Sequence, residues 1–575
     1  MITCSSVLSA EPKKSSKIDP YKEFNGRIVR NVNVEVREIF EGAELASFYR
    51  AANALKVSTR DDVIRREVLL KPGDKFDSFL LRETERELRL LGFIRQANVT
   101  AFPVEGTDQV DLVVSVQDTW TIIPQLGFSS GTGNDKITAG MAESNLMGFG
   151  KRLEALYEED EDSSGLEMVW DDRRVLGTPA QFISGVFLKD DGDEVTSYLG
   201  VPFRTLPQKT SWSLDTDWFD GINRLYEAGD ERFVYRRESV DLTGRYAFAS
   251  GDPESSLYRY SFGYSYHDDN FEEATEDDFE DINVDPDSVS RDPALLAADR
   301  RFTGPLFGIQ HIKPNFISRR YVDRFDRLED YNLGVENSLS ALIAPRGLGS
   351  SEDALIVNGA LLRGRELGGY SFGRAELSGA TRVEDDGLAN SFIHGRLLYF
   401  RPFDPWFAGG WFLGRHTLAA NLSIDYGIDL DKDQELYIGG DNVLRGYESR
   451  AFNGDKRYAL NLEDRVHLYE NLFDIVSLGA AAFIDVGAAT HDSFGEMFTD
   501  RTFADFGAGF RINFPKSSGA RVLRIDIAFP MRDGPEGSGT MEPRLLFSGG
   551  QLFGARLRSE SLGPAKESLG VGLKP

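Results

Sequence analysis

The feature that most constrains the fold is a strict alternation of apolar and polar residues, which recurs in segment after segment from Thr119 to Phe553. In one segment, five aromatic residues are separated by single polar or small residues: Tyr258, Tyr260, Phe262, Tyr264 and Tyr266. Successive side chains of a β-strand point to opposite faces, so this period of two predicts strands with one apolar and one polar face. Turn residues and acidic loops separate the segments, and about nineteen candidate strands can be counted.

The polar face decides between a soluble β-sandwich and a membrane barrel, because both alternate. In the segment 476–487, one face carries Val476, Leu478, Ala480, Ala482, Ile484 and Val486, and the other carries Ser477, Gly479, Ala481, Phe483, Asp485 and Gly487. An apolar outer face with glycine and charged residues inside is typical of a transmembrane barrel with a polar lumen. The chain has no run of 18 apolar residues, so a closed barrel is the way in which it could cross a bilayer.

Composition excludes several other classes of protein. The chain has 575 residues with 65 Lys and Arg against 93 Asp and Glu, a net charge of −28, so nucleic acid is not an expected partner. A single cysteine, Cys4, excludes a disulfide framework and a cysteine-rich metal site, and the six histidines are scattered. We therefore expect no metal site and no cofactor.

Two local patterns invite other functions. The acidic stretches 157–165 and 270–292 could bind divalent cations near a charged lipid surface, but solvated external loops explain them better. The motif "GFSSG", Gly127–Gly131, matches the pattern of a hydrolase nucleophile. That pattern requires a strand followed by a helix, and the sequence favours no helix there. We expect no enzymatic activity and no catalytic residue.

The first part of the chain has a different pattern. Residues 27–39 alternate as a half-buried strand, a helical stretch and the turn "KPGDKF" follow, and 78–91 places Leu80, Leu81, Leu88 and Leu91 near one helical face. Ser78 or Asp77 is available as the helix N-cap, and Gly92 as the stop signal. Two further strands complete the order β, α, α, β, β. This order, with "ERELRLLGFIRQANV" and "VDLVVSV", resembles a polypeptide-transport-associated (POTRA) domain.

The strands near the C-terminal end bring charged residues together. In 457–467, one face carries Arg457, Ala459, Asn461, Glu463, Arg465 and His467. Glu463 and Asp485 therefore point into the lumen from successive strands, next to a loop that carries Arg445. A guanidinium can bind two carboxylates at once, which predicts an ion pair inside the barrel. Asp464 falls on the outward face, which requires a bulge or a position near the membrane rim.

The same loop carries a family resemblance. "IGGDNVLRGYES" resembles the lumen-loop motif of the BamA/TamA-type outer-membrane assembly superfamily, "FIDVG" resembles its inner-wall motif, and "LLFSGGQLF" resembles its last strand. By residue match, the loop motif falls on Arg445, Gly446 and Tyr447, its inner-wall partners on Glu463 and Asp485, and its supporting glycines on Gly439, Gly440 and Gly487. Leu444 stands where valine is usual, and only one POTRA-like domain is legible where assembly members commonly have several.

The resemblance implies a transmembrane antiparallel β-barrel of about sixteen strands, five of them after the loop motif, with an N-terminal α+β POTRA-like domain. The expected division is a terminal segment 1–23, a POTRA-like domain 24–118, a barrel 119–553 and a C-terminal tail 554–575 that we expect to be disordered. "VLSA" before Glu11 is typical of the end of a signal peptide, with an ordinary disordered terminus as the alternative.

The implied function is the insertion or translocation of β-rich client polypeptides at the bacterial outer membrane. The expected partners are the lipid bilayer, client polypeptides, and periplasmic accessory proteins or chaperones that bind the POTRA domain. Two alternatives remain open: a two-partner secretion transporter that exports one dedicated polypeptide, and a passive pore or structural surface antigen.

Overall fold

A computed structural model describes most of the chain. The described residues are 19–40, 53, 56–129, 136–160, 162–440, 443–499, 501–518, 522–535 and 537–549. The expected terminal segment and C-terminal tail therefore lie almost wholly outside the described residues.

The N-terminal domain is a three-stranded sheet with two helices. The middle strand β3 (Gln109–Asp118) pairs in parallel with β1 (Ile28–Arg37) and antiparallel with β2 (Ile94–Pro103). Helices α2 (Asp61–Glu67) and α3 (Ser78–Leu90) contribute to the same apolar core, and the Asp77 side chain caps α3 by accepting a hydrogen bond from the backbone of Phe79. Of the apolar helix positions that the sequence indicates, Leu81, Leu88 and Leu91 are buried, and Leu80 packs partly buried against the core.

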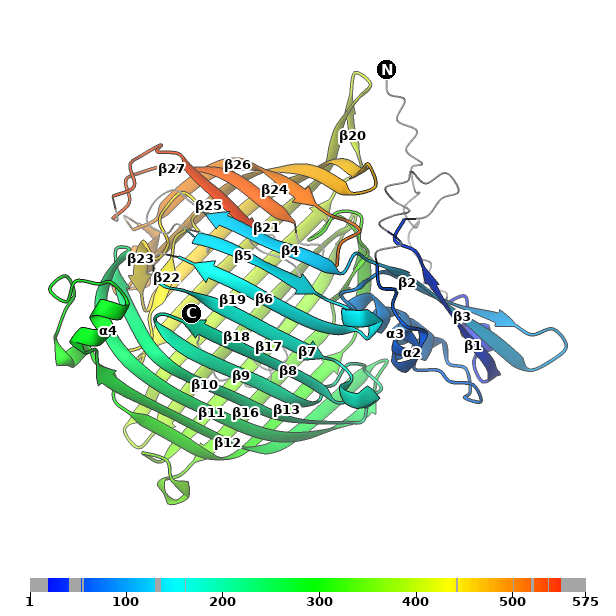
Figure 1. Cartoon of the computed structure of the whole chain (residues 1–575), viewed down its shortest axis with the longest axis horizontal. Coiled ribbons are helices and arrows are strands. Elements are labelled where there is room, and N and C mark those ends of the chain that lie inside the picture. The colour runs from blue at the N-terminus through cyan, green and yellow to red at the C-terminus, as the bar shows by residue number, and fades with distance from the viewer. Residues whose placement is uncertain are drawn as a thin grey trace.

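The rest of the chain forms a closed barrel (Figure 1). Its strands are β4 (Ile122–Ser129), β5 (Lys136–Glu143), β6 (Lys151–Glu159), β7 (Ser164–Asp172), β8 (Gln181–Lys189), β9 (Gly192–Val201), β10 (Thr210–Glu227), β11 (Asp230–Asp252), β12 (Ser256–Glu273), β13 (Arg300–Lys313), β16 (Val335–Ala344), β17 (Ala354–Gly368), β18 (Ser371–Glu384), β19 (Gly387–Pro402), β21 (Trp411–Ile428), β24 (Lys456–Leu472), β25 (Val476–Thr490), β26 (Phe503–Asn513), β27 (Leu523–Pro530) and β28 (Arg544–Gly549). The short strand β20 (Trp406–Ala408) pairs antiparallel with the start of β21, and β28 lies beside β4 to close the wall.

The fold class expected from the sequence is confirmed: an antiparallel barrel follows a small α+β domain. Within the described residues, twenty strands form the wall, four more than the sixteen that the resemblance implies, and five of them follow the loop motif as it implies. The even number has a physical reason, since only an even number of strands lets every neighbouring pair, including the closing pair, run antiparallel. The difference in number lies before the loop motif, where nearly every candidate strand joins the wall.

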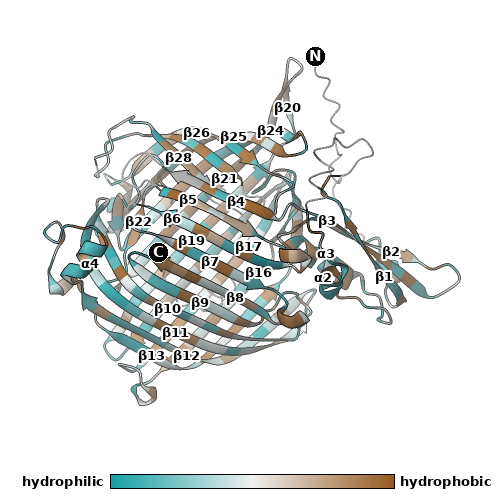
Figure 2. Ribbon diagram, in the orientation of Figure 1, coloured by the Kyte–Doolittle hydropathy of each residue, from teal (hydrophilic) through white to brown (hydrophobic). Residues whose placement is uncertain are grey.

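The alternation of the sequence becomes the two faces of the wall. Along β25, the odd-numbered residues from Ser477 to Gly487 are buried, while the even-numbered residues are partly or fully exposed. Large apolar side chains such as Leu361, Leu377 and Phe510 are exposed on the outside. Figure 2 shows apolar residues along the middle of the wall and hydrophilic residues toward the end that carries α4 (Glu276–Asp281). No helix among the described residues is long and apolar enough to cross a membrane.

The N-terminal domain sits at one end of the barrel, called here the proximal end; the opposite end is the distal end (Figure 1). Between β3 and β4, the backbone of Trp120 donates to Lys516 and accepts from Ser518, with both hydrogen bonds 2.6 Å long. Farther round the rim, Arg174 binds Glu67 of α2 through Nε and Nη2, at 2.7 and 2.6 Å. Arg89 of α3 binds Asp330 at 2.8 Å. The domain is therefore fastened to several proximal connections.

Two connections are long enough to fold into structures of their own. At the proximal end, residues 314–334 join β13 to β16 and contain β14 (Phe316–Arg319) and β15 (Glu329–Asn332). At the distal end, residues 429–455 join β21 to β24 and contain β22 (Leu436–Ile438) and β23 (Phe452–Gly454). Short 3-10 helices occupy Lys22–Phe24, Leu146–Gly148, Val175–Gly177, Pro293–Leu295, Arg346–Leu348 and Glu496–Phe498.

Candidate functional site

The candidate site is the contact between the distal connection 429–455, called here the lumen loop, and the inner wall. Arg445 is 0% exposed, and its guanidinium binds Asp485 through two hydrogen bonds, Nε to Oδ2 at 2.7 Å and Nη2 to Oδ1 at 3.0 Å. Its Nη1 donates to Glu463 at 3.4 Å and to Asp526 at 3.2 Å. The guanidinium carbon lies 3.3 Å from the ring centre of Phe483, which adds a cation–π contact. One loop residue thus binds three strands of the wall.

Inward-facing glycines on β26 allow Arg445 to contact side chains from the two strands on either side, β25 and β27. A Cβ on Gly507 would lie 2.4 Å from Cζ of Phe483, and a Cβ on Gly509 would lie 2.0 Å from Oδ1 of Asp526. Because neither position carries a side chain, the side chains of Phe483 on β25 and Asp526 on β27 can extend over β26 toward the guanidinium. The inner face of β26 at Gly507 and Gly509 is therefore free of side chains, which leaves room for side chains from both neighbouring strands.

Arg445 belongs to a larger buried charge cluster. Arg511 pairs with Asp526 and Glu463, and Arg465 pairs with Glu463. The cluster holds four arginines and four carboxylates, each at most 3% exposed: Arg445, Arg465, Arg511, Arg524, Glu463, Asp485, Asp505 and Asp526. Buried charges are tolerated where they are paired, and the ion pairs of Glu463, Asp485 and Asp526 with the arginines meet that condition.

Glycine is required at two kinds of position around Arg445. A Cβ on Gly446 would lie 2.6 Å from Cβ of Asp505, so the loop approaches the wall too closely for any side chain. Gly439 and Gly440 have φ of 141° and 55°, values that favour glycine, and Gly440 donates its backbone N–H to Tyr447. Gly487, on the wall, would place a Cβ 2.8 Å from the backbone oxygen of Tyr458.

Tyr447 holds the loop next to Arg445. Its ring is 0% exposed and packs edge-on against Phe452 and Phe503, with ring centres 5.3 and 5.5 Å away. Its hydroxyl lies 3.1 Å from the backbone oxygens of Ala504 and Arg532. The structure thus brings together all five residues of the expected motif and its inner-wall partners.

The lumen loop also reaches the opposite side of the barrel. Asp433 receives two hydrogen bonds from Arg300 of β13, at 2.7 and 2.8 Å, and Asp431 receives two from Arg382 of β18, at 2.8 and 2.9 Å. Burial alone would raise the pKa of Asp433, but the hydrogen bonds and charge of Arg300 outweigh it and lower that pKa. The loop therefore spans the distal lumen from wall to wall.

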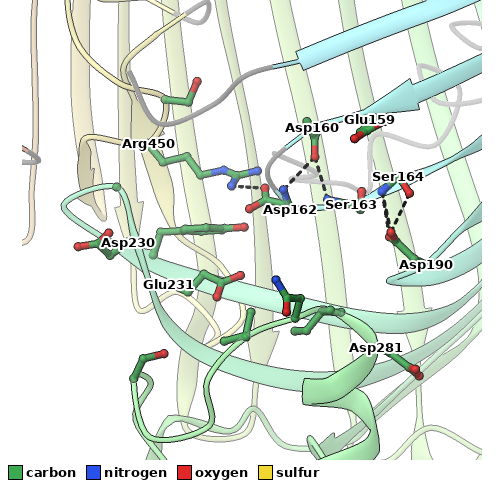
Figure 3. Close-up of a pocket in the computed structure, with 17 residues that line it drawn as sticks. Glu159, Asp160, Asp162, Ser163, Ser164, Asp190, Asp230, Glu231, Asp281 and Arg450 are labelled. Atoms are coloured by element: carbon green, nitrogen blue, oxygen red, sulfur yellow. Dashed lines mark hydrogen bonds and ion pairs between the residues drawn. The ribbon is translucent and has the colours of Figure 1, made fainter. Parts of the chain in front are cut away.

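A cavity of about 690 Å³ lies beside the lumen loop at the distal end (Figure 3). Distal connections of the wall line it together with Ser449 and Arg450 of the loop. Arg450 forms an ion pair with Asp162 and lies over the ring of Tyr226 at 4.0 Å. Seven of the seventeen lining residues are acidic and one, Arg450, is basic, yet in the described part of the chain no three His, Cys, Asp or Glu side chains gather as metal ligands would.

The proximal connection 314–334, called here the proximal plug, enters the lumen from the other end. Val322 is 0% exposed and packs with Phe400 and Ala419 of the wall. Its backbone oxygen accepts a hydrogen bond from Arg465 of the charge cluster at 2.8 Å. Phe325 packs edge-on against His467, with ring centres 4.6 Å apart. Together with the Arg89–Asp330 pair, this plug connects the N-terminal domain to the cluster that binds Arg445.

Sequence reasoning missed both Asp526 and the proximal plug. Asp526 lies two residues after Arg524 on the same inward face of β27, so alternation could have indicated it. Its approach to Arg445 across the glycines of β26 could not be predicted, because that approach depends on the three-dimensional arrangement of the strands. Asp464 points outward and binds His416 at 2.8 Å, and no register shift occurs at its position, so of the two explanations the bulge is wrong and the position near the membrane rim stays a prediction. The first part of "GFSSG" ends β4, and the rest lies outside the described residues.

Comparison with known proteins identifies the N-terminal domain first. Residues 56–118 match the POTRA family, described as surface antigen variable number repeat. The outer membrane protein assembly factor BamA of Neisseria meningitidis serogroup B is 34% identical over 97 residues, 16% of this chain. BamA of Nitratidesulfovibrio vulgaris is 32% identical over 135 residues, 23% of this chain. The chain is a relative of the BamA-type outer-membrane proteins.

This relationship fixes the orientation of the barrel. The chain lies in the bacterial outer membrane with its POTRA domain, and hence its proximal end, on the periplasmic side. The aligned stretches span only 12% and 17% of the lengths of these two relatives. A crystal structure of BamA from Haemophilus ducreyi lacking POTRA domains 1–3 is 14% identical, with a TM-score of 0.36 over 91% of this chain and 84% of that one.

Proposed function

We propose that this BamA-type relative inserts or translocates β-rich client polypeptides at the outer membrane, using neither a nucleotide nor a metal. The observation that carries the proposal is the contrast between a filled lumen and a short closing pair of strands. The lumen loop and the proximal plug enter the lumen from opposite ends, so straight passage along the barrel axis is obstructed. The wall itself offers the other route.

Within the described residues, the closing pair joins two of the shortest strands of the wall. β28 has six residues and β4 has eight, whereas β10 and β11 are paired over 18 positions. A short ladder has few backbone hydrogen bonds to break, and an opened strand edge can pair with a strand of a client. The edges of the POTRA sheet, β1 and β2, offer further sites for strand addition.

In this proposal, Arg445, Gly446 and Tyr447 hold the lumen loop on the inner wall, with Glu463 and Asp485 as the partners of the arginine. The contacts of Arg445 with Glu463, Asp485 and Asp526 set the positions of β24, β25 and β27, which precede the closing strand β28. The role of Arg445 is to position the wall: it keeps the strands next to β28 in one geometry while β28 and β4 separate. The expected bilayer, client and periplasmic accessory partners belong to the same proposal.

Depletion of the protein tests the proposal against its alternatives. We expect broad loss of β-barrel proteins from the outer-membrane proteome, restored by the wild-type chain and less well by Arg445→Ala. Loss of one exported polypeptide alone would contradict insertion and indicate a dedicated secretion transporter. Unchanged proteomes together with large solute flux would contradict both and indicate a passive pore.

A further inference from the structure

The most exposed aromatic cluster of the described chain lies on a hairpin that leaves the barrel at its proximal rim. β20 and the start of β21 form this hairpin, which projects away from the wall in Figure 1. Trp411 is 78% exposed and Phe407 64%, and Trp406 and Phe412 are also exposed. From Pro405 to Gly414 the hairpin carries no charged residue, and Asp404 and Arg415 flank it.

The two faces of the hairpin are both apolar. Phe407 and Phe412 face each other across the strands with ring centres 5.5 Å apart. Ala408 and Trp411 are paired on the other face, which Trp406 shares. An aromatic hairpin exposed on both faces does not serve as a core element, because a core element buries at least one face.

The hairpin continues the lipid-facing surface of the barrel. Trp406 stacks on His416 with ring centres 4.1 Å apart, and His416 stands on the outward face of β21 beside outward Asp464. Leu418, two residues farther along the same face, is exposed on the outer wall. The outward face of β21 thus leads from apolar Leu418 past the polar His416–Asp464 pair to the aromatic hairpin, the order of groups expected where a wall passes from the acyl chains into the headgroup region.

We propose that this hairpin is a membrane foot that lies in the headgroup region of the periplasmic leaflet. Tryptophan suits this region because its ring is apolar while its N–H can bond to headgroups or water. The position at the proximal rim and the sideways projection place the hairpin along the membrane surface instead of across it. A foot on one side of the barrel fixes the depth and the tilt of the wall, and with them the height of the docked POTRA domain above the membrane.

A fluorescent label on the hairpin tests the proposal in the full chain. Cys4 is the only cysteine, so Cys4→Ser provides the background for Ala408→Cys carrying an environment-sensitive fluorophore. Leu377→Cys on the outer wall and Glu105→Cys in the POTRA domain serve as matched controls for lipid and water. The proteins are reconstituted into phosphatidylcholine–phosphatidylglycerol vesicles that contain quencher lipids labelled near the headgroup or near the bilayer centre.

We expect the Ala408 label to be quenched most by the headgroup-labelled lipid and to be protected from iodide relative to the Glu105 label. Adding Trp411→Ser should reduce this lipid quenching while the gel mobility of the folded barrel stays the same. Iodide quenching equal to that of the Glu105 label would overturn the proposal. Protection from both lipid and iodide, which would indicate a protein partner, would also overturn it. A quenching profile equal to that of the Leu377 label on the outer wall would do the same.

Discussion

Arg445 and Asp485 form a two-pronged ion pair inside the barrel, with N–O distances of 2.7 and 3.0 Å and both side chains 0% exposed. The arginine comes from a distal loop and the aspartate from the wall, so the pair joins two parts of the chain 40 residues apart. Removing one partner of a buried pair leaves the other charge without compensation, which makes such pairs sensitive to single substitutions.

Arg445→Ala should therefore destabilise the folded barrel by about 3–5 kcal/mol, because Asp485, Glu463 and Asp526 would lose a shared cation. The measurement is the temperature at which the folded band disappears in a heat-modifiability gel. Arg501→Ala, which changes an exposed arginine on a distal loop, is the matched control and should leave that temperature unchanged. Equal melting temperatures of the folded band in the two variants would show that the Arg445–Asp485 pair does not stabilise the barrel.

Gly446→Ala should weaken the same contact without changing any charge. The added Cβ would lie 2.6 Å from Cβ of Asp505, so either the loop or the wall must move, at a cost of about 1–3 kcal/mol. Gly495→Ala is the control, since a Cβ there meets nothing within 4 Å and φ is −68°. The same gel assay should separate the two variants, and a stable Gly446→Ala protein would argue against close apposition of loop and wall.

Much of this site could be predicted from sequence, for a physical reason. Alternation fixes which side of a strand each residue occupies, so the inward placement of Glu463 and Asp485 follows from parity alone. Alternation does not indicate how far a side chain reaches across a neighbouring strand, or which loop fills the lumen. For that reason, three features could be found only in the three-dimensional structure: the contact of Asp526 with Arg445, the space above Gly507 and Gly509, and the proximal plug. The number of strands was also out of reach, because alternation does not tell a wall strand from a hairpin in a loop.

Shortening the proximal plug should open the lumen only in part. Replacing residues 315–332 with a short Gly-Ser linker removes the contacts of Val322 and Phe325 but leaves the lumen loop in place. We expect a modest rise in single-channel conductance in planar bilayers, and a larger rise when Arg445→Ala is added. Full conductance from the plug deletion alone would contradict a lumen filled from both ends.

Acid should loosen the contact between the POTRA domain and the barrel. Burial raises the pKa of Glu67, but the hydrogen bonds and charges of Arg174 and Arg173 outweigh it and hold that pKa below its ordinary value of 4.5. The stabilisation is therefore present above about pH 4.5 and lost as the pH falls through the lowered pKa of the folded state. Burial raises the pKa of neighbouring Glu87, which pairs with Arg173, so Glu87 is protonated first.

Distance distributions between spin labels at Glu105→Cys and Asp386→Cys, in the Cys4→Ser background, measure this loosening. They should broaden as the pH is lowered below about 4.5 and narrow again on return to neutral pH. Glu67→Gln should give a broader distribution already at neutral pH. A distribution that does not change with pH in the unmodified contact would refute the proposed electrostatic fastening.

In the proposed function, clients pass through the joint between β28 and β4. The most direct test of this route is a disulfide across that joint. Cysteine pairs, one in 122–126 and one in 544–548, are screened in the Cys4→Ser background for bridging, and the bridged protein is reconstituted into vesicles with an unfolded barrel client. We expect client insertion to stop in the oxidised protein and to return when a reductant breaks the bridge. Equal insertion in the oxidised and reduced states would contradict this route.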